Sequence, residues 1–385
     1  MSYPSVMVIG GSLPRATLSV VRTLGRRGIP VFGGDSRRLA PPAFSRYTRR
    51  WFSYPSGDAA KAHDVITAHV NAWRPAVLLP VGNQGWAVIL RYFADYAGVT
   101  AVIPSPGWDL FERLRDKATL AALAEEHEVP VPLTFRPQTH EEALALRHRL
   151  PYPVLLKPRG GEAGVGIVRA DGEHQLTEAL TQSGEVPLIQ QYVDGEDLDL
   201  TLCCVHGRPV AVSTYVTLRK YPEPYGVPVA CRTTRDDELI EIGTRFLGAL
   251  RYHGVANLDF RRDRRDSRPK LLDFNPRLAG TTEVSVASGV DLPWVLYRLA
   301  LGEEPQRLLS SKSGVEVRWP IGEFQHLLAT RDKRSALRAL WRWRRVATNV
   351  SLTDPLPHLA EAIVAVHRSL RRTRWFPSRG EPRVV

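Results

Sequence analysis

The chain has 385 residues, enough for two or three domains at about 150 residues each. With 43% hydrophobic and 24% charged residues, its composition is that of a globular protein and not of a disordered one. The three cysteines, Cys203, Cys204 and Cys231, fit neither a disulfide framework nor a zinc motif. No apolar run reaches the ~18 residues of a spanning helix, and the N-terminus lacks the features of a signal peptide. These observations exclude the secreted and integral membrane classes and favour a cytoplasmic protein.

The positive charge is concentrated near the C-terminus. Residues 311–385 contain 15 Lys and Arg against 6 Asp and Glu, so this fifth of the chain holds +9 of the net charge of +12. The rest of the chain is close to neutral, which disfavours nucleic-acid binding by the body of the protein. Any surface for a polyanion is therefore expected in the C-terminal segment.

Strands and helices alternate through the first part of the chain. This pattern predicts a Rossmann-like α/β domain over residues 1–105, with a parallel, doubly wound sheet. The expected strands are 6–9, 30–32, 77–80 and 100–103, and the expected helices are 16–27, 59–73 and 84–97. The first turn, Gly10-Gly11-Ser12, lacks the third glycine of a dinucleotide fingerprint, so a plain turn or another small ligand is favoured over NAD.

An α+β body of mostly antiparallel strands is predicted after the break at residues 104–107. Its expected helices are 111–127 and 236–250, and its expected strands are 154–157, 166–169, 188–192, 199–205, 210–216, 255–261 and 269–274. We divide it into a central domain over 106–192 and a C-terminal domain over 193–305. A basic, amphipathic helical extension is expected over 306–385.

A glycine-rich loop follows the strand 154–157. Its glycines are Gly160, Gly161, Gly164 and Gly166, and their backbone N–H groups could close over phosphate oxygens. Lys157 stands at the end of the strand, where it could meet a phosphate as a point charge. Taken alone, the loop fits a phosphate lid and a glycine-rich hairpin equally well.

Two consecutive strands carry oxygen ligands. Asp273 and Asn275 point to one face of their strand because side chains alternate, and Asp259 on the adjacent strand can join them. Two carboxylates and an amide oxygen suit Mg²⁺ bound with nucleotide phosphates and do not suit zinc. The competing interpretation, a solvated polar hairpin end, is disfavoured by the apolar flanks Leu258 and Phe274.

With these motifs the chain resembles the ATP-grasp superfamily, in the branch of carbamoyl phosphate synthetase, biotin carboxylase and D-aspartate ligase. The resemblance runs from about Arg115 to Gly302 and implies ATP and Mg²⁺ as cofactors, with two ions and Mn²⁺ as a substitute. It implies that Lys117 and Lys157 bind ATP phosphates and that residues 160–166 form the mobile lid.

The resemblance also implies an adenine hinge and a substrate site. The hinge residues would be Gln190, Gln191, Tyr192 and Val193, with Asp197 near the ribose. Asp259, Asp273 and Asn275 resemble the metal ligands, and Arg277 of Asn-Pro-Arg resembles the arginine that binds a carboxylate or acyl phosphate. The chain departs from the family in two places: Asp273 stands where glutamate is usual, and the hinge begins with glutamine instead of glutamate.

The segment 217–226 and the residues after it resemble family loops that face the γ-phosphate and the acceptor. Cations there could neutralise charge that develops during phosphoryl transfer, and we expect Arg232 first and Lys220 second in this role. Arg232 is expected close to the start of a helix. A solvated basic loop is the alternative.

The sequence therefore predicts an ATP-dependent ligase that joins a carboxylate to an amine, an amino acid being one candidate substrate, through an acyl phosphate. An ATP-dependent carboxylase or carbamoyl phosphate type enzyme, and a nucleotide-binding protein without turnover, stay open as alternatives. A homodimer is compatible with all three. The nature of the carboxylate and amine is not encoded in the phosphate motifs.

The basic extension has two amphipathic stretches. The first places Leu337, Leu340 and Trp341 at helical spacing among Arg338, Arg342 and Arg345, and the second places Leu359, Ile363, Val366 and Leu370 on one stripe before Arg371 to Phe376. These stretches could pack on the body, or they could rest on anionic lipid at the inner membrane face with Trp343, Trp375 and Phe376 at headgroup level. Nucleic acid is the least favoured partner.

Overall fold

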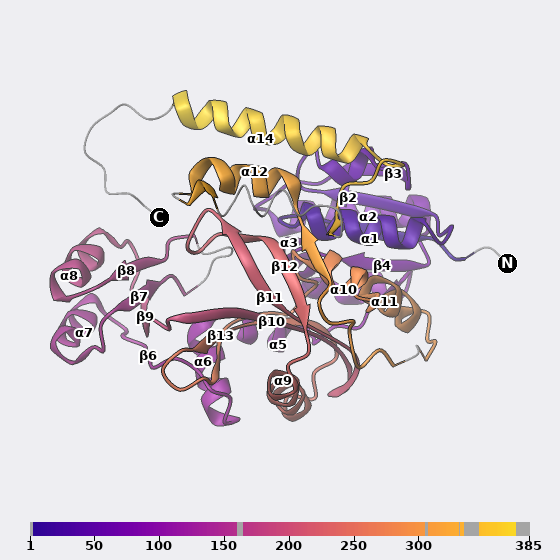
Figure 1. Cartoon of the computed structure of the whole chain (residues 1–385). Helices are drawn as coiled ribbons and strands as arrows, with labels where there is room; N and C mark the ends of the chain where they lie inside the picture. Colours follow the sequence, from indigo (N-terminus) through magenta and orange to yellow (C-terminus); the bar gives the residue numbers. More distant parts are fainter. Residues whose placement is uncertain (1–2, 160–164, 305–306, 331, 335–345, 375–385) are drawn as a thin grey trace.

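The structure, a computed structural model, describes residues 3–159, 165–304, 307–330, 332–334 and 346–374, with the backbone alone for 366–374. Three β-sheets organise these residues (Figure 1). Gly160, Gly161 and Gly164 of the expected lid, and the first basic stretch around Trp341, lie outside the described residues.

The N-terminal sheet is parallel and has the order β3-β2-β1-β4-β5. Its strands are β1 (Val6–Ile9), β2 (Val31–Asp35), β3 (Thr48–Ser53), β4 (Val77–Pro80) and β5 (Ala101–Val102), and its helices are α1 (Pro14–Gly25), α2 (Ala59–Trp73), α3 (Asn83–Arg91) and α4 (Phe93–Ala97), with the 3-10 turn η1 (Pro41–Phe44). This confirms the predicted doubly wound domain. The expected single helix over 84–97 is wrong, because Tyr92 leaves helical geometry between α3 and α4. Strand β3 was not predicted, since four of its six residues are polar.

A small antiparallel sheet of order β6-β9-β7-β8 follows. It contains β6 (Thr134–Phe135), β7 (Val154–Lys157), β8 (Val168–Ala170) and β9 (Leu188–Gln191), with α7 (His140–Ala145), η2 (Arg147–Arg149) and α8 (Glu173–Gln182) beside it. Apolar residues of α7, α8 and the strands form its own small core.

The third sheet has the order β14-β13-β10-β11-β12-β15-β16 and is antiparallel except for its last pair. Its strands are β10 (Gly195–Val205), β11 (Arg208–Tyr221), β12 (Val227–Thr234), β13 (Gly254–Asp263), β14 (Pro269–Asn275), β15 (Glu316–Arg318) and β16 (Ala347–Thr348). Alternation along β10 sends Leu198, Leu200 and Leu202 into a core with α5 (Trp108–Arg115), α6 (Lys117–Glu126) and α9 (Asp237–Ala249). The expected helix 111–127 is therefore two helices, because the Asp116 side chain caps α6 by accepting from Thr119 N–H at 2.7 Å.

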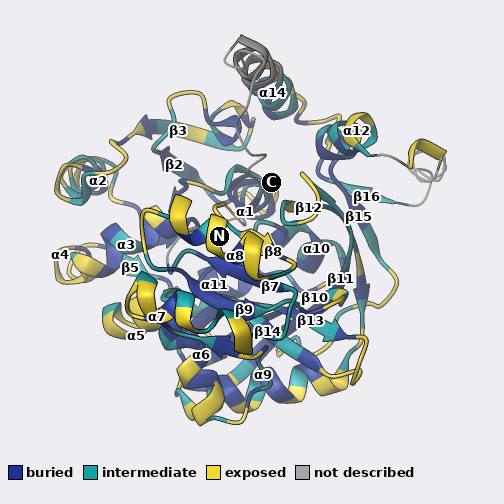
Figure 2. Ribbon diagram, turned by 90° about the vertical axis from the view of Figure 1, so that its left-hand side faces the viewer, coloured by how far each residue is buried: buried dark blue, intermediate teal, exposed yellow. Residues whose placement is uncertain are grey.

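The opposite face of this sheet packs against the N-terminal domain. Cys203 and Val255 share a core with residues of β1, α1 and β4, and with α11 (Leu292–Ala300), while α10 (Thr282–Ala287) covers β11 and β12 (Figure 2). This face carries the polar residues of β10, β13 and β14, so it brings them next to the N-terminal domain.

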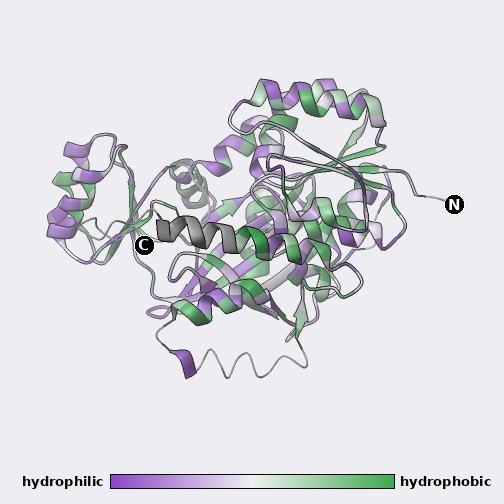
Figure 3. Ribbon diagram, turned by 90° about the horizontal axis from the view of Figure 1, so that it is seen from above, coloured by the Kyte–Doolittle hydropathy of each residue, from purple (hydrophilic) through white to green (hydrophobic). Residues whose placement is uncertain are grey.

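The C-terminal segment contains strands as well as helices, and of its two predicted amphipathic stretches the second is seen as a helix. After β15 come α12 (Pro320–Ala329), β16 and α14 (Leu356–Arg374), and α14 contacts η1 of the N-terminal domain. Figure 1 shows α14 at the top of the molecule, and in Figure 3, which is seen from above, this helix faces the viewer and part of it is drawn as hydrophobic. Among the described residues, no helix is long and apolar enough to span a bilayer.

Candidate active site

Three carboxylates lie side by side on the face of the large sheet that meets the N-terminal domain. Asp199 of β10 is in register with Asp259 of β13, and Asp259 is in register with Asp273 of β14. Register partners in an antiparallel sheet share a face, with Cβ atoms ~5 Å apart. The expected neighbours Asp259 and Asp273 are thus brought together, and Asp199 is a member of the row that the sequence analysis missed.

Burial and mutual repulsion destabilise the ionised form of the carboxylates in this row. Burial raises the pKa of Asp259 well above its usual value, and the charges of Asp199 and Asp273 raise it further. Burial also raises the pKa of Asp199. Clustered buried carboxylates without enough positive charge around them are costly, and a divalent cation would offset that cost.

Asn275 links this row to Arg277. The amide Nδ2 of Asn275 donates to Asp259 Oδ2 at 3.3 Å, and its Oδ1 accepts from Arg277 Nη2 at 2.7 Å. Arg277 is only 6% exposed, and its Nε donates to Asn83 Oδ1 of α3 at 2.9 Å. A residue of the N-terminal domain therefore orients the arginine that the sequence analysis placed at the substrate.

The donor set of this row fits Mg²⁺. Carboxylate and amide oxygens are hard ligands, and Asp259, Asp273 and Asn275 would hold the ion. Asp199, the register partner of Asp259, is a further carboxylate beside them. Within the described residues, no three His, Cys, Asp or Glu side chains already form a metal cage. Mg²⁺ usually takes one or two carboxylates and completes its shell with substrate phosphates and water.

Of the two predicted phosphate lysines, Lys157 lies near this row, and Lys117 lies near Lys157. Burial lowers the pKa of Lys157 to about 8; attraction to Asp273 acts against this, while repulsion from Lys117 and Arg261 adds to it. Lys157 Nζ donates to Gln190 Oε1 at 2.6 Å, and Gln190 Nε2 donates to Thr134 Oγ1 at 3.0 Å. The glutamine that departs from the family pattern is thus the neutral partner of a buried lysine.

The remaining hinge and lid residues are placed as follows. The N–H groups of Gln191 and Tyr192 donate to Leu133 and Pro153 carbonyls at 2.9 Å each, which leaves Val193 as the hinge residue whose N–H could read an adenine edge. The Val193 carbonyl accepts from Arg261 Nη1 at 3.1 Å. Gly166 has a φ of +78°, a conformation that favours glycine at the end of the expected lid.

Asp197 is held by two cations. Its carboxylate lies 2.6 Å from Lys220 Nζ and 2.6 Å from Arg261 Nη2. Because β10 alternates, Asp197 lies on the same face as Asp199. Asp197 and Lys220 are therefore brought to the same end of the site, where they belong to one ion-pair network.

Arg232 is not brought to the site. It lies on β12, five residues before the start of α9, as expected from the sequence. The register partner of its neighbour Cys231 is Thr217, which donates to Asp199 Oδ2 at 3.3 Å. Alternation turns the exposed Arg232 to the other face of the sheet. The expected loop 217–226 is also partly wrong, because β11 continues to Tyr221 and pairs with β12.

A second polar row lies one step closer to the N-terminal domain. Ser213, Thr201, Asn257 and Asn275 are register partners across β11, β10, β13 and β14. Ser213 Oγ, Thr201 Oγ1 and Asn257 Nδ2 are buried without a hydrogen-bond partner. Buried polar atoms of this kind are costly unless something pairs with them, and this row adjoins Arg277 through Asn275.

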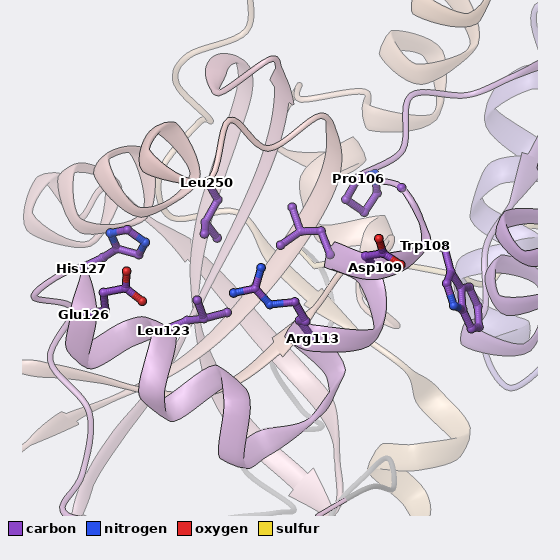
Figure 4. A pocket seen from close by; sticks show the side chains of 10 residues that line it. Pro106, Trp108, Asp109, Arg113, Leu123, Glu126, His127 and Leu250 are labelled. Carbon is purple, nitrogen blue, oxygen red and sulfur yellow. The ribbon is translucent and has the colours of Figure 1, made fainter.

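A cavity of about 560 Å³ lies elsewhere, between α5, α6 and the end of α9 (Figure 4). Leu110, Leu123 and Leu250 form its apolar part, with Arg113 and Glu126 among its charged residues. These helices pack on the face of the sheet opposite the carboxylate row. The cavity therefore contains none of the predicted site residues.

Comparison with known proteins agrees with this arrangement. Residues 185–322 match the family model described as ATP-grasp in the biosynthetic pathway with Ter operon. Biotin carboxylase from Campylobacter jejuni, solved as a β,γ-ATP complex, is similar over 82% of this chain and 74% of its own, with a TM-score of 0.66 and 17% identity. The chain has the ATP-grasp fold. No curated protein matches the sequence significantly.

Two further ATP-grasp structures are similar at comparable levels. The biotin carboxylase domain of 2-oxoglutarate carboxylase from Hydrogenobacter thermophilus, a dimer in complex with MgADP, ADP and bicarbonate, has a TM-score of 0.62 and 14% identity over 82% of this chain and 73% of its own. L-amino acid ligase from Bacillus licheniformis has a TM-score of 0.60 and 16% identity over 78% and 75%. The resemblance drawn from the motifs is confirmed at the level of the ATP-grasp fold.

Proposed function

We propose that this ATP-grasp protein is an ATP-dependent carboxylate–amine ligase that works through an acyl phosphate. The observation that carries the proposal is the row of the buried Asp199 and the half-buried Asp259 and Asp273, joined through Asn275 to Arg277. Lys157, outside the large sheet, interacts electrostatically with Asp273 and with Lys117. The arrangement supplies one place for metal-bound phosphates and, beside it, a buried guanidinium for a carboxylate.

The reaction has two steps. A carboxylate oxygen of the first substrate attacks the γ-phosphorus of ATP, and the bond between that phosphorus and the bridging oxygen of ADP breaks. The amine nitrogen then attacks the acyl carbon, the carbon–oxygen bond to phosphate breaks, and the amine loses a proton to solvent. Phosphate is a far better leaving group than the oxide that direct attack on a carboxylate would require.

The residues divide the work by position. Lys157 and Lys117 would meet ATP phosphates, Val193 N–H would read the adenine edge, and Asp197 would lie near the ribose. Arg277, oriented by Asn83, would hold the substrate carboxylate. Thr201 and Asn257 would pair with other polar groups of the substrate. When bound at Asp259, Asp273 and Asn275, Mg²⁺ would neutralise phosphate charge.

The fold neighbours support nucleotide chemistry of this class. The Campylobacter jejuni structure is a β,γ-ATP complex, and the Hydrogenobacter thermophilus structure contains MgADP. The Bacillus licheniformis neighbour is an amino acid ligase. Because two of these three neighbours are carboxylase structures, bicarbonate is retained as a second candidate acceptor of the phosphoryl group.

Hydroxylamine tests the acyl phosphate. With ATP, Mg²⁺ and a panel of carboxylic and amino acids, we expect hydroxylamine to trap the true carboxylate as a hydroxamate, with ADP as the nucleotide product. Mass spectrometry identifies the hydroxamate and chromatography the nucleotide. AMP with pyrophosphate would show adenylation and rule the mechanism out, whereas ADP release that depends on bicarbonate alone would favour the carboxylase type.

The Lys157 pKa of about 8 predicts a pH-dependent nucleotide affinity. Below pH 8 the free protein carries the lysine as a cation that attracts phosphate, and above it the cation is increasingly lost. Affinity for ATP is therefore expected to fall as pH rises through 8, while Gln190→Glu, which places a carboxylate beside Nζ, should move that fall to higher pH. Calorimetric titration with ADP and ATP from pH 7 to 9 measures both.

Lys157→Ala provides the control for this profile. At pH 7 the variant should bind ATP about 10- to 150-fold more weakly, because one charge-assisted contact worth about 1.5–3 kcal/mol is lost. Its affinity should then be flat across the same pH range. Unchanged affinity at pH 7, or the same slope in wild type and variant, would show that Lys157 does not face the phosphates.

A further inference from the structure

Helix α14 presents its apolar stripe outward. Leu356, Leu359 and Ile363 are 55%, 58% and 67% exposed and follow one another at the three- and four-residue spacing of a single helix face. The sequence continues this spacing with Val366 and Leu370. An amphipathic helix that only packs on its own protein turns this stripe inward, so the orientation of α14 points to an apolar partner outside the described part of the chain.

The inner side of α14 carries the buried Pro357 and is held to α1 by a hydrogen-bond contact and an ion pair. His358 Nε2 lies 3.0 Å from Arg22 Nη2, and Glu361 lies 3.7 Å from Arg15 Nε, both arginines being on α1. These contacts fix which side of the helix faces the N-terminal domain. The outward orientation of the leucine and isoleucine side chains follows from them.

The exposed apolar residues of the chain gather at this end. Seven of the seventeen large hydrophobic residues that are exposed in the described part of the chain lie between positions 324 and 363. They include Phe324 and Leu328, one turn apart on α12 and 56% and 65% exposed. Figures 1 and 2 show α12 and α14 at the same end of the molecule.

Two kinds of apolar partner are considered for this surface, a second copy of the chain and a lipid membrane. The charge of the region decides between them. The last turns of α14 carry Arg368, Arg371, Arg372 and Arg374 in the sequence, and Glu361 is the only carboxylate of the helix. A second copy pairing through this helix would bring four arginines to a surface where α14 offers one carboxylate, Glu361. An anionic lipid surface supplies both an apolar layer and negative headgroups.

We propose that α14, with the exposed residues of α12, is a docking surface for an anionic membrane. Leu356, Leu359 and Ile363 enter the boundary between headgroups and acyl chains, and the arginines at the end of the helix lie at the negative headgroups. The helix lies in the interface and does not cross it. This surface is separate from the carboxylate row and does not depend on the proposed ligase activity.

Vesicle co-sedimentation of the full chain tests the proposal. We expect the protein to sediment with phosphatidylcholine vesicles that contain phosphatidylglycerol at about 0.1 M salt, and to be released at about 1 M salt or when phosphatidylcholine is the only lipid. Leu359→Ser/Ile363→Ser should weaken partitioning at least about tenfold, because two apolar side chains are removed. Arg371→Glu/Arg372→Glu should also weaken binding to the anionic vesicles, because it replaces two cations by two anions.

The matched control is Phe93→Ser/Val99→Ser, which removes two exposed apolar side chains at α4 in the N-terminal domain. It should leave partitioning unchanged, and circular dichroism should show all variants folded. Absence of binding at low salt, or equal binding by wild type and Leu359→Ser/Ile363→Ser, overturns the proposal. A dimer in light scattering that the same double variant dissociates, without vesicle binding, would instead assign the surface to a second copy.

Discussion

Asp273→Asn is expected to abolish ATP turnover, a loss of at least about a hundredfold, while the protein stays folded. The substitution keeps the shape of the side chain and removes a charge from the row with Asp259 and Asp199. Because the charge of Asp273 helps to raise the pKa of Asp259, its removal relieves repulsion in the metal-free protein. The thermal midpoint without Mg²⁺ should therefore be unchanged or higher, and the stabilisation that Mg²⁺ with ADP gives the wild type should be reduced.

Asp266→Asn is the matched control for this variant. Asp266 lies in the turn between β13 and β14, 3.1 Å from Lys270, with its side chain 43% exposed. Removing its charge should leave ADP release close to the wild-type rate. Near-normal ADP release from a folded Asp273→Asn protein, measured beside this control, would refute the assignment of the metal site.

The carboxylate row shows what strand alternation can and cannot predict. Asp273 and Asn275 are two residues apart on one strand, and Asp259 is on the next strand of the hairpin, so their common face follows from local pattern alone. Asp199 comes from β10, about 60 residues earlier in the chain. Only the register between β10 and β13 places it beside Asp259, although the alternation of Leu198, Leu200 and Leu202 with polar residues already marked its face.

Arg232 shows how sensitive such predictions are to a missed strand. Pro222, Pro224 and Gly226 favour a loop, and the residues after them were therefore not assigned to a strand. In the structure β12 begins directly after that turn, and one position along a strand reverses the direction of the side chain. Cys231 thus faces the site and Arg232 faces away from it.

Contacts between remote segments were beyond prediction. Neither the hydrogen bond from Arg277 to Asn83 nor the attachment of the C-terminal segment to α1 has a signal in local sequence, because each joins residues nearly 200 or more positions apart. No local sequence pattern in α3 or α1 marks Asn83 or Arg22 as a contact between remote segments. Their roles depend on how the large sheet and the N-terminal domain pack.

Arg22→Met is expected to release the C-terminal segment from the N-terminal domain. Arg22 and Asp354 are 4% and 2% exposed and form an ion pair of 2.8 Å, and Arg22 also donates to the carbonyls of Asp354 and Asn349. Burial acts to raise the pKa of Asp354, but hydrogen bonds from Arg22, Arg46 N–H and Ser45 together hold it below its usual value. Removing the arginine leaves a buried carboxylate without its cation, at a cost of about 3–5 kcal/mol.

Hydrogen exchange measures this cost where it arises. In Arg22→Met the amides of β16 and of the first turns of α14 should exchange faster by two orders of magnitude or more, because the free energy of local opening falls by about 3 kcal/mol. The amides of β13 and β14 should keep their protection. Arg46→Met is the control, because that exposed arginine reaches the same segment through a single side-chain hydrogen bond to the Thr353 carbonyl, and its loss should cost less than about 1 kcal/mol.

The Arg22–Asp354 ion pair also predicts acid sensitivity. Since the pKa of Asp354 is lowered in the folded state, the stabilisation by its carboxylate is present above the unfolded-state pKa and is lost as pH falls through the folded-state pKa. Wild type should therefore approach the exchange pattern of Arg22→Met at low pH, and equal protection of α14 in wild type and Arg22→Met at neutral pH would show that this ion pair does not hold the segment.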